Sequence, residues 1–211
     1  MQVNSYDKFI DEQKEYFKNK LYQPNDALWE DSFWLKTGVG SSWLLSRGKS
    51  SISFNSINKT KGLPNINISE YYQQFCKAML VYSYRQANGK VSPQKLVAEL
   101  LVLKRWFYSL KEITYDTHPT KLSTEILNHA YYLLKNNSSA TNLPDHVGTF
   151  KRLQDVVNKY GCTSKKLEFE VDLKYINKQN RTQKARTTKE LLEDKNIDEN
   201  KINVEKLISI Q

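Results

Sequence analysis

Cysteine is nearly absent from this chain of 211 residues, and the two that occur, Cys76 and Cys162, are far apart. Two distant cysteines suggest neither a disulfide framework nor a zinc site, so a reducing cytoplasm is the expected location. Long apolar runs are also missing, since none approaches the roughly 20 residues of a membrane-spanning helix. The opening stretch MQVNSYDKFIDEQ is polar and acidic and has no signal-peptide pattern. We therefore expect a soluble, cytoplasmic protein without a membrane partner.

Motifs for catalysis or cofactor binding are almost entirely lacking. The three histidines, His118, His129 and His146, have no ligand partner two to five residues away, and no glycine-rich phosphate loop is present. One weak pattern remains, in which Asp145 and Asp172 would hold Mg²⁺ beside Lys174, as in a restriction-type nuclease. Asp145 is already explained as a helix start, so the sequence predicts no catalytic residue, no metal and no cofactor.

Positive charge is abundant. The 32 Lys and Arg residues outnumber the 23 Asp and Glu residues, which gives a formal net charge of +9. Such a balance makes DNA, RNA or an anionic membrane surface the first partner classes to consider. An ordinary basic protein with no such partner is the alternative that charge alone leaves open.

Helical periodicity dominates the middle of the chain. In Ser92–Glu112, apolar residues recur at Leu96, Leu100, Leu103 and Phe107 at helical spacing, behind a proline at the first helical position. Val97, Leu101 and Tyr108 widen this stripe, so the helix is expected at the centre of its domain. Three further helices are predicted, from Ser69 to Asn88-Gly89, from Ser123 to about 135, and from Pro144 to Gly161. The predicted fold class is mainly α, a compact bundle of four or more helices.

The two ends have different characters. Residues 1–68 are predicted to contain a helix over 5–22, a short helix over 27–36 with buried Trp29, Phe33 and Trp34, and an extended segment with one weak hairpin from the runs WLLS and SISF. Residues 162–211 are predicted to be a flexible basic linker and the start of a following domain. Residues 165–189 hold eight Lys or Arg against three Asp or Glu, a net +5, and Leu167, Phe169 and Val171 alternate with acidic residues. That alternation indicates either a short strand or a half-buried extended linker.

Residues 69–161 resemble the core-binding, or SAM-like, domain that precedes the catalytic domain of tyrosine recombinases and phage integrases. The resemblance lies in the tandem amphipathic helices, with LVAELLVLKRWFYSL as the second and LPDHVGTFKRLQDVVNKYG as the fourth. It implies a helical domain that lies on one side of DNA, followed by a basic linker along the duplex. That family's catalytic domain supplies a His-x-x-Arg motif, which is absent here, so the resemblance implies no catalytic residue in this chain.

The best interpretation is DNA binding by the N-terminal part of an integrase-like recombinase, with double-stranded DNA and other copies of the chain on that DNA as partners. The candidate DNA-binding residues are Lys95, Lys104, Arg105, Lys111, Lys151, Arg152, Lys165, Lys166, Lys174 and Lys178. Lys104 and Arg105 are the pair to test first. The alternative is a helical protein-interaction module that binds its partner through exposed aromatics such as Tyr71, Tyr72 and Tyr131.

Overall fold

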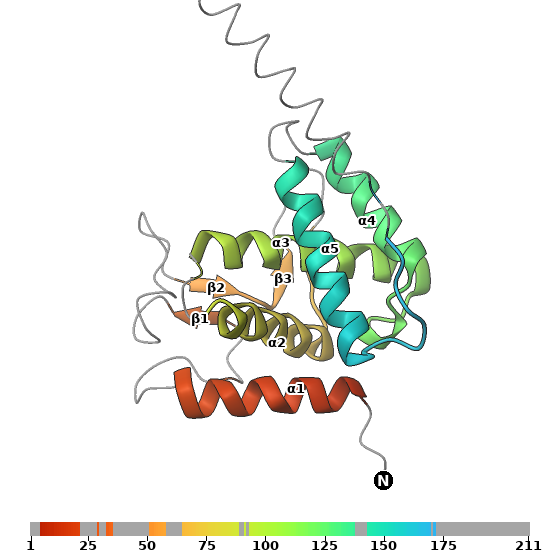
Figure 1. Ribbon diagram of the computed structural model, residues 1–211. Coiled ribbons are helices and arrows are strands. Elements are labelled where there is room, and N and C mark those ends of the chain that lie inside the picture. Colours follow the sequence, from red (N-terminus) through yellow and green to blue (C-terminus); the bar gives the residue numbers. More distant parts are fainter. Residues whose placement is uncertain are drawn as a thin grey trace, which may run out of the picture.

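The protein is mainly helical, as the sequence predicts. The computed structural model describes residues 5–21, 29, 33–35, 51–57, 65–88, 91, 93–137, 143–169 and 171 (Figure 1). Five α-helices lie in these ranges, α1 (Ser5–Tyr16), α2 (Glu70–Gln86), α3 (Pro93–Thr114), α4 (Thr124–Asn137) and α5 (Leu143–Tyr160). Helices α2 to α5 are the four predicted over the middle of the chain, and they pack compactly. None of the described helices is long and apolar enough to cross a bilayer.

The residues at the helix ends have the capping roles expected from their type, with one exception. Ser123 accepts a hydrogen bond from the Ile126 amide at 3.4 Å and so caps the start of α4. Gly161 follows α5 with a φ of +60°, a left-handed conformation that glycine adopts at little cost. Ser69 precedes α2 but makes no side-chain cap there. Its hydroxyl instead donates to the Thr117 carbonyl at 3.4 Å, which ties the start of α2 to the segment after α3.

Helix α3 is the spine of the bundle and contacts α2, α4 and α5 (Figure 1). Leu96, Leu100, Leu103 and Phe107 are all buried, as their spacing predicts. Each such side chain contributes roughly 1.5–3 kcal/mol by leaving water. The stripe is narrower than predicted, because Leu101 is 42% exposed. The helix therefore keeps a face for solvent.

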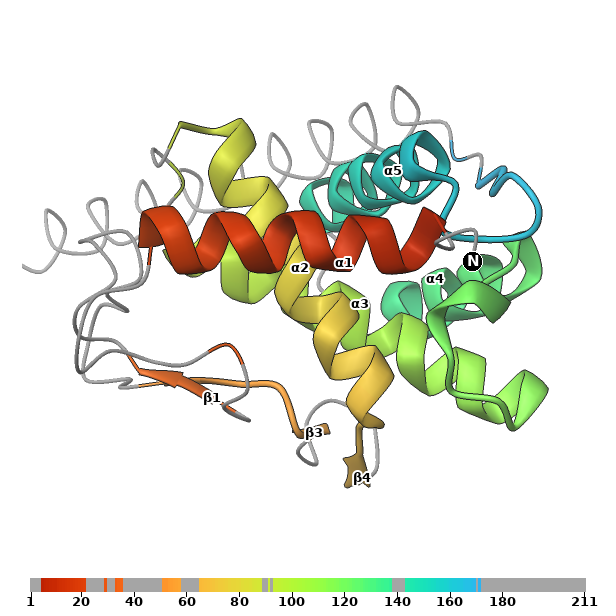
Figure 2. The ribbon, with the colours of Figure 1, turned by 90° about the horizontal axis from the view of Figure 1, so that it is seen from below.

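Helix α1 belongs to the same core as the bundle. It lies across α2, and Tyr6 and Phe9 are buried against the interior (Figure 2). The helix then continues as a π-helical turn, Phe17–Leu21. One cluster of buried side chains includes α1, the four later helices and Phe169. The hydrophobic core therefore runs across both predicted domain boundaries, at 68/69 and at 161/162.

The predicted short helix over 27–36 is wrong at residues 33–35. Strand β1 (Phe33–Leu35) pairs antiparallel with β2 (Ser51–Ser53), and β3 (Ser56–Ile57) pairs with β4 (Ile66–Asn67). The bulky FWL run suits a strand, and the partner strand, distant in sequence, satisfies its backbone groups. Trp29 is buried as predicted, and its carbonyl accepts a hydrogen bond from Lys77 Nζ at 2.5 Å. The WLLS run lies outside the described residues.

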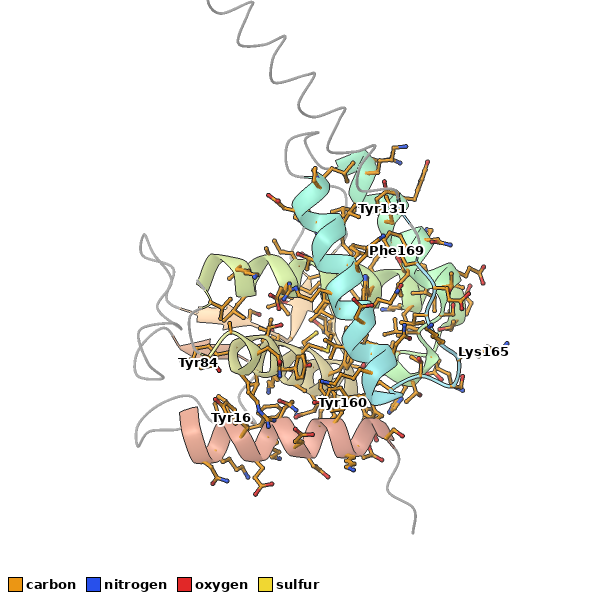
Figure 3. The ribbon with its side chains drawn as sticks, viewed as in Figure 1. Tyr16, Tyr84, Tyr131, Tyr160, Lys165 and Phe169 are labelled. Atoms are coloured by element: carbon orange, nitrogen blue, oxygen red, sulfur yellow. The ribbon has the colours of Figure 1, made fainter. Side chains whose placement is uncertain are left out.

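The first part of the predicted flexible linker is packed against α5. Asn158 mimics a strand partner, since its amide donates to the Leu167 carbonyl at 2.9 Å and accepts from the Leu167 amide at 2.8 Å. The Phe169 ring is 2% exposed and lies beside Tyr131 of α4 (Figure 3). Of the two sequence interpretations, the half-buried extended segment holds over residues 167–169, where Leu167 and Phe169 are buried, Glu168 is exposed and no strand forms. We refer to residues 162–169 as the docked tail.

Candidate nucleic-acid interface

Helix α5 forms a ridge between two hollows in the protein surface. On one side lies a cavity of about 660 Å³, lined by residues of α3 and α5. On the other side lies a cavity of about 410 Å³, lined by α5 and the docked tail. We call them the α3–α5 hollow and the tail hollow. The candidate basic residues Lys95, Lys151, Arg152 and Lys166 line these two hollows, so the fold brings together four residues from three separate segments.

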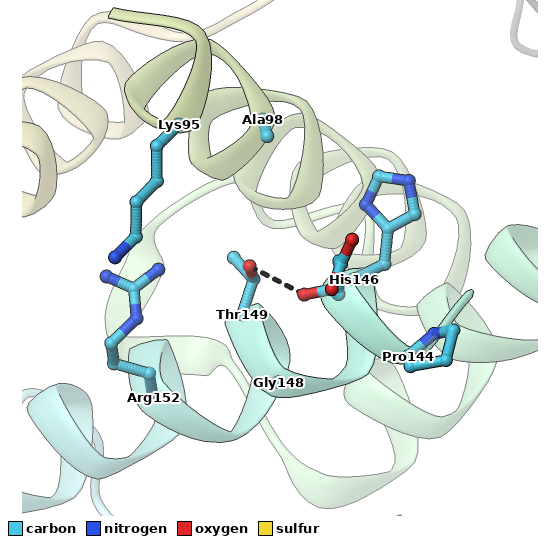
Figure 4. Close-up of a pocket in the computed structure, with 8 residues that line it drawn as sticks. Lys95, Ala98, Pro144, His146, Gly148, Thr149 and Arg152 are labelled. Carbon is cyan, nitrogen blue, oxygen red and sulfur yellow. Dashed lines mark hydrogen bonds between the residues drawn. The ribbon is translucent and has the colours of Figure 1, made fainter. Parts of the chain in front are cut away.

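The α3–α5 hollow holds two cations that point toward one another. Lys95 extends from the first turns of α3 and Arg152 from the middle of α5 (Figure 4). The rest of the lining consists of Ala98, Pro144, Asp145, His146, Gly148 and Thr149. The Thr149 hydroxyl donates to the Asp145 carbonyl at 2.9 Å, so it is not a spare donor for a ligand. Lys95 and Arg152 also line an adjoining cavity of about 380 Å³, which reaches Lys159 at the end of α5.

Arg152 is held by a carboxylate that the sequence analysis did not single out. Glu99 is completely buried, and its Oε1 lies 2.7 Å from Arg152 Nη1. The N–H bonds of Arg152 are not aimed at that oxygen, so neither oxygen of Glu99 has a hydrogen-bond donor among the described residues. Arg152 Nη2 is likewise buried without an acceptor in this part of the chain. Arg152 keeps 37% of its side chain exposed, so the guanidinium contacts the buried Glu99 carboxylate on one side and the solvent of the α3–α5 hollow on the other.

The tail hollow joins Lys151 of α5 to Lys166 of the docked tail. Gln154 and Asn158 also line it, but both bind the tail backbone, Gln154 by accepting from the Phe169 amide at 2.6 Å. Asp155 lines this hollow and the 380 Å³ cavity, so it lies on the crest of the ridge. Across the three cavities, five basic residues face three exposed acidic ones, which leaves the ridge net positive.

The pair that the sequence favoured, Lys104 and Arg105, makes contacts within the fold, with Arg105 buried and Lys104 half-buried. Lys104 Nζ donates to the Ser56 carbonyl at 2.6 Å and anchors β3 to α3. Arg105 is 8% exposed, and its guanidinium donates to the Leu101 carbonyl at 3.3 Å. Burial lowers the pKa of both side chains below their ordinary values. Arg105 therefore presents no surface on which a polyanion could lie, and Lys104 presents only part of its side chain.

The remaining candidates are dispersed. Lys111 is exposed, but it lies 16 residues after Lys95 on α3, which is about 24 Å along the helix axis. Lys165 is exposed in the docked tail, beyond the end of α5 (Figure 3). Lys174 and Lys178 lie outside the described residues. Lys159, which was not predicted, lies over the rings of Tyr82 and Tyr160, and its hydrogen bond to the Tyr82 hydroxyl raises its pKa.

The predicted aromatic surface is only partly exposed. Tyr71 is 64% exposed, but Tyr72 is fully buried, and its hydroxyl donates to the Leu103 carbonyl at 2.9 Å. Tyr131 is half-buried beside Phe169. Tyr115, which was not predicted, is 89% exposed with a φ of +59°. Tyr72 is thus excluded from a protein-binding surface because its ring is needed in the core.

The nuclease interpretation gains no support from the described residues. Asp145 lies in the first turn of α5, whereas Asp172 and Lys174 fall outside the described ranges. Within those ranges no group of three or more His, Cys, Asp or Glu residues could hold a metal ion. His129 Nδ1 lies 3.0 Å from the Ser109 hydroxyl, so this contact joins α4 to α3.

The position of Glu99 in the sequence already indicates a buried carboxylate. Glu99 lies three residues after Leu96 and four before Leu103, so it falls inside the apolar stripe of α3. A carboxylate on the buried face of a helix needs a cationic partner, because an unpaired buried charge is costly. The identity of that partner, Arg152, could not be deduced from the sequence, since the pairing depends on how α5 crosses α3.

Comparison with known proteins gives no match: no protein-family model, no curated protein and no solved structure proves similar to this chain.

Proposed function

We propose that the chain binds double-stranded DNA through the α5 ridge, as the N-terminal, core-binding-like part of an integrase-like recombinase. The observation that carries this proposal is the convergence of Lys95, Lys151, Arg152 and Lys166 on the two sides of one helix. A helix flanked by cations on both sides suits a polyanion whose charges lie in two rows, which is the arrangement of phosphates along a DNA groove. The net charge of +9 favours the encounter.

The assignment to a recombinase rests on the sequence resemblance alone. The helical bundle and the basic stretch after it are compatible with that resemblance. DNA binding, in contrast, is also supported by the placement of charge, and it can be tested without a catalytic domain. DNA binding is therefore the part of the proposal to test first.

The test is a fluorescence-anisotropy titration of duplex DNA at 50 and 200 mM salt. Lys95→Gln, Lys151→Gln and Lys166→Gln are combined in one variant, which leaves the Arg152–Glu99 pair intact. If these lysines neutralise three phosphates, the triple variant lowers the steepness of log affinity against log salt by about 2.7. The same substitutions at Lys8, Lys18 and Lys121, which are exposed outside the ridge, form a control with the same net charge.

The proposal predicts that the control triple binds DNA as the unmodified chain does, whereas the ridge triple binds far more weakly at 50 mM salt. Equal losses in the two variants would mean that only the overall charge matters and that α5 is not the interface. Binding by the unmodified chain that does not change with salt would exclude phosphate contacts altogether.

A helical protein-interaction module is the second candidate. It is favoured by the exposure of Tyr71 and Tyr115, two large aromatic side chains near the His118 segment. Aromatic residues of this kind are enriched at binding hot spots. Under this alternative, Tyr71→Ser abolishes self-association measured by light scattering, and the ridge triple has no effect on it.

A further inference from the structure

The docked tail runs back along α5 in a fixed register (Figure 1). The Asn158 side chain binds both backbone groups of Leu167. Gln154, one turn earlier on α5, accepts from the Phe169 amide. Four residues of a helix rise about 6 Å, and two residues of an extended chain span about 6–7 Å. Because these two spacings nearly coincide, two amide side chains on one face of α5 meet alternate residues of the tail.

A further contact holds the tail to a second helix. Thr124 Oγ1, at the start of α4, accepts from the Glu168 amide at 2.9 Å. Three consecutive amides of the tail, those of residues 167–169, are thus bound by side chains instead of by a partner strand. We refer to Thr124, Gln154 and Asn158 as the tail clamp. All three side chains are neutral, so the clamp itself adds no attraction for phosphate.

The register of the clamp decides which side chains of the tail face the solvent. Leu167 and Phe169 are buried in the core. Neighbouring residues of an extended chain point to opposite faces, and Lys166 and Glu168 are accordingly exposed. A slip of one residue would bury these two charged side chains and expose the two apolar ones. The clamp therefore keeps Lys166 at the tail hollow, which Lys151 of α5 also lines.

The tail hollow is electrically balanced, since its lining includes two lysines and two carboxylates. Net attraction for phosphates on this side of α5 therefore has to come from further basic residues. Residues 173–189 contain six Lys or Arg and no Asp or Glu. That basic stretch begins four residues after Phe169, and four residues of chain span at most about 14 Å. The docked position of Phe169 therefore limits how far from α5 the basic stretch starts.

We propose that the three residues of the tail clamp are positioning residues for DNA binding, which dock the tail so that Lys166 is held beside α5 and the basic stretch starts from a fixed point. The inference rests on the proposed function. Cations held in place lose less conformational freedom on binding than cations on a free chain. If docked chains bind DNA more tightly, the apparent dissociation constant rises as the docked fraction falls. By reciprocity, DNA favours docking to the same extent.

The experiment uses the full chain, duplex DNA and a variant that changes no charge. Gln154→Ala and Asn158→Ala together remove three hydrogen bonds to the tail and form the clamp double. Asn128→Ala and Asn136→Ala, at two exposed amides of α4, form the control double. Fluorescence anisotropy at 50 and 200 mM salt gives the affinity, and hydrogen exchange at the amides of residues 167–169 reports tail docking.

We expect the clamp double to exchange these amides faster, to bind DNA more weakly and to have a shallower dependence of log affinity on log salt. The loss of steepness should be at least about 0.9, the contribution of one phosphate contact. Unfolding of part of the sample would lower the active concentration without changing this steepness. A clamp double whose tail amides exchange freely, yet whose affinity and steepness equal those of the control double, would overturn the inference.

The unmodified chain provides a measurement that does not depend on whether the clamp double folds. The amides of residues 167–169 exchange when the tail undocks locally, so binding that is indifferent to docking leaves their rates unchanged. We expect saturating DNA to slow their exchange by the same factor by which full undocking weakens DNA binding. Unchanged exchange rates at saturating DNA would contradict the coupling.

The outcomes separate this inference from the proposed function. If the clamp double loses affinity and steepness while Lys95→Gln combined with Lys151→Gln has no effect, the clamp stands and the α5 ridge falls. If the ridge triple weakens binding while the clamp double behaves as its control, the ridge stands and the inference falls. An unmodified chain that does not bind duplex DNA overturns both.

Discussion

The Glu99–Arg152 pair allows a prediction that does not depend on any ligand. Arg152→Gln removes the cation nearest to a carboxylate that is completely buried. Removing one partner of a buried ion pair costs about 3–5 kcal/mol, because the other charge stays in the interior uncompensated. Since Arg152 keeps 37% of its side chain in solvent, the pair is partly screened, and we expect the low end of that range, about 3 kcal/mol.

Substituting the other partner of the pair, Glu99, should cost much less stability. Glu99→Gln removes the buried charge, and the half-exposed guanidinium that remains can be solvated from the hollow. We expect a loss of no more than about 1 kcal/mol, the upper end for an ion pair with a solvent-exposed partner. The double variant has neither charge, so its loss should also be about 1 kcal/mol rather than the sum of the two single losses. The cycle then gives a coupling free energy of roughly 3 kcal/mol.

Urea unfolding followed by circular dichroism measures these differences. A loss of about 3 kcal/mol lowers the urea midpoint by roughly 1–3 M for a protein of this size. Lys151→Gln, one residue before Arg152, is the control and should change stability by less than about 0.5 kcal/mol. The reasoning is refuted if Arg152→Gln costs no more than this control, or if the two single losses simply add in the double variant.

Two further predictions concern the docked tail and the buried thiols. Asn158→Ala removes both hydrogen bonds to Leu167 and should cost about 2 kcal/mol and speed hydrogen exchange at the Leu167 amide, whereas Asn136→Ala on the surface of α4 should do neither. Burial raises the pKa of the Cys76 and Cys162 thiols to about 12. The folded state therefore keeps protons that the unfolded chain releases, and stability, complete below pH 9, falls between pH 9 and 12 by roughly 1.4 kcal/mol per pH unit for each thiol. Urea midpoints at pH 8 and 10 test this, and Cys162→Ala should flatten the fall; an equally steep fall in that variant would contradict the assignment.

The helices could be predicted because their signals are local. The stripe of Leu96, Leu100, Leu103 and Phe107 determines which side of α3 is buried, whatever packs against it. The turn at Gly161 and the cap at Ser123 depend only on neighbouring residues. A periodic pattern of 15 to 20 residues averages out single exceptions, which is why the exposed Leu101 did not mislead the assignment.

The strand at Phe33–Leu35 and the docked tail could not be predicted in the same way. The strand exists because Ser51–Ser53 pairs with it, and nothing in the FWL run itself specifies that partner. The tail docks because Asn158 and Gln154 present amide groups at the spacing of a strand edge. A basic composition indicates a linker only where no such partner is available.

Basic residues that are adjacent in the sequence need not lie together on the surface, and this determines which variants should be used to test binding. Lys104 and Arg105 look like an ideal basic pair, yet consecutive residues on a helix point about 100° apart. Here Arg105 is buried, and the half-buried Lys104 donates its Nζ hydrogen bond to the Ser56 carbonyl. Bringing Arg105 to a phosphate would require opening the core, because the side chain is only 8% exposed. Lys95 and Arg152 are 57 positions apart and face the same hollow without any rearrangement. Lys95→Gln therefore tests recognition by the folded protein, whereas variants at Lys104 and Arg105, like Arg152→Gln, would mainly test its stability.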